Sequence, residues 1–185
     1  MLRKKYRRRA FLKSVGLTAV GAAASSGFSA FAAAEENAVK ETAHESIAGM
    51  EPVVELVLTF WNEVWNPPYD INKIDELMVE DFVLTSAGRD IVSRAAFKEW
   101  VRTFQAKLHE LRLYPQETFA NKGGTRVVSR WRATGKNNGM LGTKPDNRLV
   151  EFTGIAIWEI RGGRLAHNWV ERSAWELYQQ LTAEK

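Results

Sequence analysis

The chain has 185 residues and no cysteine, so neither a disulfide nor a nucleophilic thiol can contribute to it. Histidine is scarce, with three in the chain, and His44 lies in a polar stretch without a second ligand nearby. We therefore expect no metal centre. The sequence also has no glycine-rich phosphate loop and no Ser-His-Asp order. These absences exclude several common enzyme classes and predict a site without a cofactor.

The charge of the chain is unevenly distributed. The formal net charge is +4, yet residues 1–34 carry seven basic residues and no acidic one. Without that segment, 19 basic and 22 acidic residues remain, a net charge of −3. The basic character therefore belongs to the N-terminal segment, and the rest shows no nucleic-acid footprint.

The basic N-terminal segment contains Arg8-Arg9-Ala10-Phe11-Leu12-Lys13, which resembles the R-R-x-F-L-K twin-arginine export signal. A weakly apolar stretch follows, and its small residues favour cleavage after Ala34. We predict a signal peptide at 1–34, a flexible linker at 35–47, and a periplasmic or secreted protein that meets the membrane only during export. A membrane anchor is the alternative, but anchors need about 20 strongly apolar residues. A basic nucleic-acid-binding arm is a further alternative.

Residue periodicity predicts three helices followed by strands. Apolar residues at helical spacing indicate a helix from Met50 to Trp65, which ends at the prolines that follow. Asp70 and Ser93 are expected to cap two further helices. The predicted strands are 81–86, 111–119, 125–134, 149–160 and 165–173, with a polar loop at 135–147 and a short terminal helix at 174–183.

Gly162-Gly163 separates the last two predicted strands and indicates a tight hairpin turn. Helices segregated from a run of antiparallel strands define the α+β class. We expect a curved antiparallel sheet packed on three helices, enclosing an apolar pocket in which a small molecule could bind.

Several local features together resemble a known family. They are Trp61–Trp65 at a helix end, Gly88-Arg89-Asp90 before a helix, Arg130-Trp131 with Thr134-Gly135, Gly154, Gly163-Arg164-Leu165 with Trp169, and the tail Tyr178-Gln179-Gln180-Leu181. In order and spacing, residues 48–182 resemble the SnoaL-like polyketide cyclases of the nuclear transport factor 2-like superfamily. The resemblance implies one domain at 48–185, a cone-shaped barrel with an internal cavity, and a homodimer formed through the outer sheet face.

The same resemblance implies an acid/base aspartate directly after the tryptophan of the last strand, where this chain has Val170. Related sequences often place a second polar group near Ala156. Valine and alanine cannot transfer protons, so the family's cyclase activity does not carry over to this chain from the fold alone. Whether the protein is an enzyme stays open at this point.

Strand alternation divides the last strand into two faces. Asn168, Val170 and Arg172 share one face with Ala166, and His167, Trp169 and Glu171 share the other. Asn168 could donate to a carbonyl or enolate oxygen as an oxyanion group, or it could satisfy strand backbone. His167 and Glu171 are about 13 Å apart along a strand, too far for an acid/base pair.

Other charged residues also have two readings. Arg130 and Arg132 could form a solvated outer stripe, with Glu151 as a cross-strand partner, or face inward and bind a carboxylate or phosphate. Asp90 could enter the pocket or only stabilise the turn before the third helix.

Aromatic residues are the strongest indication of a ligand. The chain has seven tryptophans, and some of them are expected to line a cavity for a flat or apolar molecule. The predicted ligand-binding residues are Trp61, Trp65, Trp131, Phe152 and Trp158. The leading hypothesis is a small-molecule-binding domain with cofactor-free proton-transfer chemistry of the isomerase or cyclase type. The competing hypothesis is a non-catalytic binding or assembly module, which Val170 and Ala156 favour.

Overall fold

The computed structural model describes residues 51–184. Its elements are a helix at 51–64, α2 (Lys73–Leu77), β1 (Met78–Ser86), β2 (Arg89–Val92), α3 (Arg94–Gln105), β3 (Leu108–Ala120), β4 (Arg126–Asn137), the short 3-10 helix η1 (Met140–Gly142), β5 (Leu149–Arg161), β6 (Arg164–Arg172) and α4 (Ala174–Thr182). The predicted signal peptide and linker lie outside the described residues. Within those residues, no helix combines the length and the hydropathy that crossing a bilayer requires.

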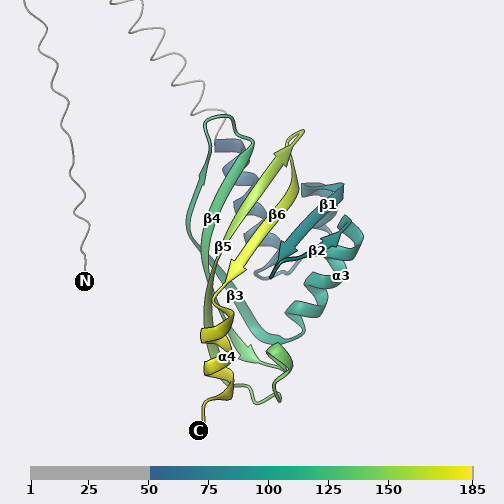
Figure 1. Cartoon of the computed structure of the whole chain (residues 1–185). Helices are drawn as coiled ribbons and strands as arrows, with labels where there is room; N and C mark the ends of the chain where they lie inside the picture. The colour runs from purple at the N-terminus through teal and green to yellow at the C-terminus, as the bar shows by residue number, and fades with distance from the viewer. Residues whose placement is uncertain (1–50, 185) are drawn as a thin grey trace, which may run out of the picture. The chain divides into compact units, whose positions relative to one another are not determined.

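The six strands form one curved sheet in the order β2-β1-β6-β5-β4-β3 (Figure 1). The α+β class is confirmed, but two details of the expectation are wrong. The sheet stays open, because β2 and β3 are edge strands that do not meet. It is also not purely antiparallel: β1 pairs with β6 in parallel, with Leu84 opposite Asn168. The parallel pair arises because the chain forms β2, α3, β3, β4 and β5 after β1, and only then returns as β6 to pair with β1.

The β5–β6 hairpin confirms the Gly-Gly turn. Gly162 and Gly163 have φ values of +57° and +72°, which residues with a Cβ seldom adopt. Along β5 every second side chain is buried, and the alternate ones face outward, including Ile155 at 49% exposure and Ile157 at 42%. This outward face is where the resemblance implies a homodimer, which stays a prediction.

The helix at 51–64 covers the concave face of the sheet and supplies much of the core. Val57, Phe60, Trp61 and Val64 recur on one face of this helix and are almost completely buried. The Trp61 indole Nε1–H donates to Ser129 Oγ of β4 at 3.0 Å. The predicted apolar face of this helix is therefore correct, and it is joined to the sheet by a buried polar contact.

Two local predictions, the cap of α2 and the segment at 87–92, differ from the structure. Asn72, not Asp70, is the N-cap of α2, and the Asp70 carboxylate instead accepts from the Asn72 backbone N–H at 2.9 Å. The turn predicted at residues 87–90 is short enough for β2 to pair with β1, which adds an unpredicted edge strand. The periodicity of apolar residues predicts neither feature.

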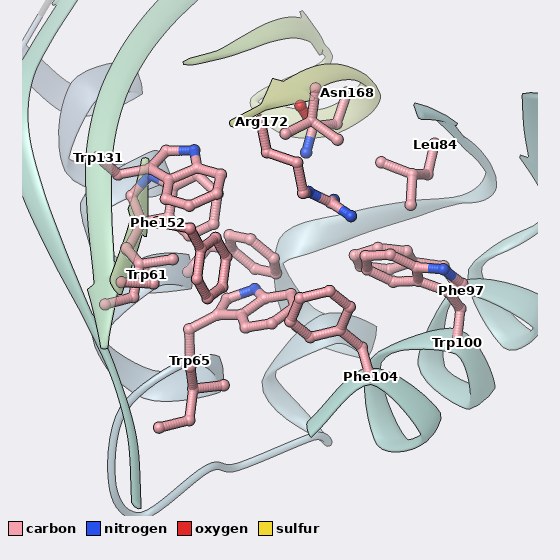
Figure 2. Close-up of a pocket in the computed structure, with 15 residues that line it drawn as sticks. Trp61, Trp65, Leu84, Phe97, Trp100, Phe104, Trp131, Phe152, Asn168 and Arg172 are labelled. Carbon is pink, nitrogen blue, oxygen red and sulfur yellow. The ribbon is translucent and has the colours of Figure 1, made fainter. Parts of the chain in front are cut away.

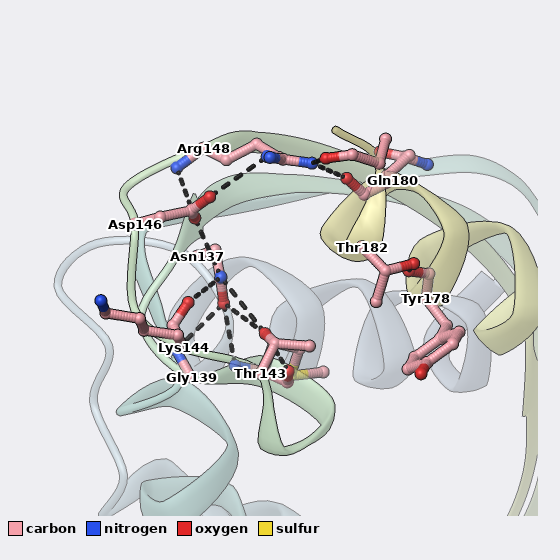
Figure 3. A network of polar contacts seen from close by, with 11 residues as sticks. Asn137, Gly139, Thr143, Lys144, Asp146, Arg148, Tyr178, Gln180 and Thr182 are labelled. Carbon is pink, nitrogen blue, oxygen red and sulfur yellow. Dashed lines mark hydrogen bonds and ion pairs between the residues drawn. The ribbon is translucent and has the colours of Figure 1, made fainter. Parts of the chain in front are cut away.

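Asn137, buried to 1% exposure, organises the segment that was predicted as a polar loop. Its side-chain oxygen Oδ1 accepts from the backbone N–H of Gly139 and Met140, and its side-chain nitrogen Nδ2 donates to Lys144 O and Asp146 Oδ1 (Figure 3). Nearby, Arg148 donates to the backbone carbonyls of Gln180 and Ala183 near the end of α4. The loop is thus held by side-chain contacts to its own backbone, and α4 is tied to the start of β5.

Gly154 of β5 permits close packing of a tryptophan on the sheet. Its partner on β4 is Trp131. A Cβ built on Gly154 would lie 2.2 Å from Trp131 Cζ2 and 2.7 Å from the backbone carbonyl oxygen of Glu171. No side chain can occupy that position unless the indole moves. Gly154 therefore determines where the Trp131 ring lies on the concave face.

We predict that Gly154→Ala lowers the free energy of unfolding by about 2–4 kcal/mol, because the added methyl overlaps the indole and a carbonyl. Gly123→Ala is the matched control, since its Cβ would meet only Thr125 Oγ1 at 3.9 Å; we expect a change within about 1 kcal/mol. Urea denaturation of both variants checks this. Equal stability of Gly154→Ala and wild type would contradict the close packing.

Candidate functional site

A pocket lies between the helix at 51–64, α3 and the concave face of the sheet (Figure 2). Its walls are aromatic and aliphatic, with two polar side chains. The aromatic lining residues are Phe60, Trp61, Trp65, Phe97, Trp100, Phe104, Trp131 and Phe152; the others are Leu84, Leu111, Leu113, Ala133, Asn168, Val170 and Arg172. The pocket therefore joins residues from both helices and from five strands.

The free space in this pocket is small. It measures about 30 Å³, room for about two water molecules, whereas pockets that hold drug-sized ligands usually exceed about 300 Å³. Aromatic rings fill the rest: the Phe60 ring centroid lies 5.0 Å from those of Trp61 and Trp158. Trp100 and Phe104 of α3 are only partly buried. A ligand larger than water therefore requires movement of side chains, and these two are the least confined.

Five of the six predicted site residues line this pocket. They are Trp61, Trp65, Trp131, Phe152 and Asn168. Trp158 does not line it, because its ring is fully buried against Phe60, Trp61 and Phe82. Alternation along β5 places Trp158 on the same face of the sheet as Phe152, but its ring does not reach the pocket.

Arg172 is the most informative site residue that the sequence did not single out. Its guanidinium enters the pocket from β6, on the same face as Asn168 (Figure 2). Its central carbon lies 5.5 Å from the Trp100 ring centroid and 5.2 Å from that of Phe104. Burial lowers the pKa of this guanidinium from its usual value, because desolvation disfavours the charged form. An arginine nevertheless stays cationic.

Several polar atoms of the pocket have no hydrogen-bond partner. They are Arg172 Nε, Asn168 Oδ1, and the indole Nε1 atoms of Trp65 and Trp131. Buried polar groups in folded proteins are normally paired, and each exception calls for an explanation. Four of the five such atoms in the described residues surround this pocket, and the fifth, Nε1 of Trp158, is buried outside it.

The pocket lacks an acid or base of the kind that the family uses. Val170 lines it and lies directly opposite Ala156 across the β5–β6 pair. Both positions at which the resemblance implies polar groups are therefore neighbours, and both are apolar. None of the 15 lining residues is an aspartate, glutamate, histidine, lysine or tyrosine.

His167 and Asp90 lie away from the pocket, near the outer face. Thr85 Oγ1 lies 2.6 Å from Asp90 Oδ1 and 2.8 Å from His167 Nε2, and the His167 ring stacks on Trp169 with centroids 3.7 Å apart. Partial burial lowers the pKa of His167; Arg126 adds to this, whereas Asp90 and Glu159 oppose it. Asp90 thus does not enter the pocket, and His167 lies with it near the outer face.

Arg130 and Arg132 also face outward. Arg132 Nη1 contacts Glu151 Oε2 at 2.8 Å, the cross-strand pair that was one of the two readings, and Arg130 pairs with Glu117. The inward, anion-binding reading of these arginines is wrong. Across residues 51–184, no group of three His, Asp or Glu side chains is arranged to hold a metal ion.

The fold and the pocket define a cone-shaped α+β domain with an aromatic interior. The family model of SnoaL-like polyketide cyclases matches residues 55–181, so the chain belongs to this family. No curated protein matches the chain.

Three solved structures illustrate the fold. A candidate SnoaL-like polyketide cyclase from Jannaschia sp. CCS1 has a TM-score of 0.67 at 16% identity, over 74% of this chain and 95% of that one. A candidate polyketide cyclase from Acidithiobacillus ferrooxidans has 0.61 at 24%, over 70% and 94%. An LEH-like epoxide hydrolase from M. tuberculosis has 0.57 at 15%, over 71% and 90%. At these identities the likeness establishes the fold alone.

Proposed function

We propose that this domain binds a small, flat, apolar organic molecule in the pocket between α3 and β6. The observation that carries the proposal is the set of unpartnered polar atoms, on Trp65, Trp131, Asn168 and Arg172, inside an otherwise apolar and aromatic chamber. A core built only for stability would satisfy these groups or replace them with apolar ones. A ligand that carries an oxygen acceptor would satisfy the donors on Trp65, Trp131 or Arg172, whereas Asn168 Oδ1 needs a donor.

Binding without proton-transfer catalysis is the form of this proposal that the residues favour. Cyclisation and isomerisation need a base that removes a proton next to a carbonyl. The lining residues supply donors, in Asn168 and Arg172, but no such base, and Val170 occupies the position of the family's aspartate. Asn168 could still stabilise an oxyanion, so a catalytic role would require a base that the ligand itself or another molecule provides.

Entry to the pocket has to involve α3. The free volume is about 30 Å³, so rings must separate before an organic molecule can enter. Trp100 and Phe104 are partly exposed and lie 5.3 Å apart by ring centroids. We propose that these two side chains swing outward on their helix while the fully buried Phe60 and Trp158 stay in place.

Nuclear magnetic resonance of the indole N–H groups tests ligand binding. We expect 2-naphthoate or its amide, 2-naphthamide, to shift the Trp65 and Trp131 resonances saturably, because these indoles line the pocket without a partner. Trp175, 64% exposed on α4, is the internal control and should not move. Absence of a saturable shift at Trp65 and Trp131 with both probes would contradict the proposal.

We also propose that the protein is exported, on the strength of Arg8-Arg9 and the residues that follow. Replacing both arginines by lysine should leave the protein in the cytoplasm, because the twin-arginine signal depends on the pair. Arg3→Lys, outside the motif, is the control. Cell fractionation measures the outcome, and unchanged export of the double variant would contradict this proposal.

A further inference from the structure

We propose that the pocket is selective for an aromatic carboxylate, whose carboxylate group pairs with Arg172. This inference rests on the proposed function and names the chemical class of the ligand. It follows from a positive charge that lies partly buried and unpaired at the apolar site.

The pocket side of Arg172 contains no anion, and burial outweighs the attraction of the neighbouring Glu171 carboxylate. The guanidinium lies over the rings of Trp100 and Phe104, at 5.5 and 5.2 Å, and Nε has no hydrogen-bond partner. No lining residue carries a carboxylate, and Glu171, next along the strand, is exposed. Ring faces attract a cation only partly, so they do not replace the hydration that burial removes.

Other arginines of the described chain show how such a charge is normally satisfied. Arg148 is also largely covered, and it has the Asp146 carboxylate at 3.2 Å and two backbone carbonyls as acceptors. Arg132, on the outer face, pairs with Glu151. Arg172 is partly buried, its Nε is fully covered, and it has neither kind of partner; this difference indicates an acceptor that arrives from outside.

The Arg172 guanidinium suits a carboxylate by itself. A guanidinium fork can hold both oxygens of a carboxylate. Asn168 lies four residues before Arg172 on the same strand face, about 13 Å away along the strand, so it faces another part of the ligand. One cation matches a ligand of single negative charge, and it disfavours a cationic ligand. A neutral ketone would leave the charge unpaired.

The rest of the pocket suits an aromatic body. Trp100 and Phe104, which contact the guanidinium, belong to the same wall as Trp65, with the Phe104 and Trp65 centroids 5.4 Å apart. A flat ring that enters beside them replaces ring-to-ring contacts with similar ones. The carboxylate end then meets Arg172, and the apolar end meets the side chains of the sheet.

Isothermal titration calorimetry of the full chain with 2-naphthoate and 2-naphthamide tests the inference, because the two probes have the same shape and differ in charge. We expect the wild type to bind the carboxylate at least about tenfold more tightly than the amide, as a charge-assisted pair would require. Arg172→Gln should reduce that preference to about twofold or less. Arg130→Gln, at the outer face, is the matched control and should keep it.

The wild-type comparison decides the inference even if Arg172→Gln does not fold. Equal affinity for the two probes would overturn carboxylate selectivity while leaving pocket binding in place. A preference that survives in folded Arg172→Gln would also overturn the role of Arg172. If neither probe binds, the proposed function itself is wrong.

Discussion

The proposed function depends on one electrostatic constraint, the partial burial of the Arg172 guanidinium over aromatic rings without a paired carboxylate. Burial disfavours this charge, as the lowered pKa indicates, and a protein selected only for stability has little reason to keep it. The unpartnered indole N–H groups of Trp65 and Trp131 are further donors at the same pocket. Together they support the proposal that the pocket binds a ligand with an acceptor.

The architecture could largely be predicted from periodicity and turn chemistry. The helix before Asn66, the Gly162-Gly163 hairpin and the alternation along β5 all report local backbone preferences, which a single sequence carries. The parallel β1–β6 pair and the open sheet depend on which strands meet after long connections, and no local signal encodes that. Asn137 shows the same limit, because its buried network depends on a loop whose course periodicity does not predict.

The site could be predicted in its aromatic part and not in its polar part. The positions of Trp61, Trp65 and Trp131 in the pocket could be predicted from the faces of a helix and a strand on which they lie. The small free volume could not, because it depends on how the rings pack against one another. Strand alternation did place Arg172 on the same face as Asn168. Its importance arises from the lack of a partner, and that becomes visible only when the side chains around it are known.

The stability of Arg172→Met tests the central claim most directly. Methionine keeps an apolar, flexible side chain of similar length against Trp100 and removes the charge. If Arg172 is enclosed without a partner, the variant should unfold with a free energy about 1–3 kcal/mol higher than that of the wild type in ligand-free urea denaturation. A free energy of unfolding equal to or lower than that of the wild type would contradict the account, because it would mean that the protein itself already satisfies the charge.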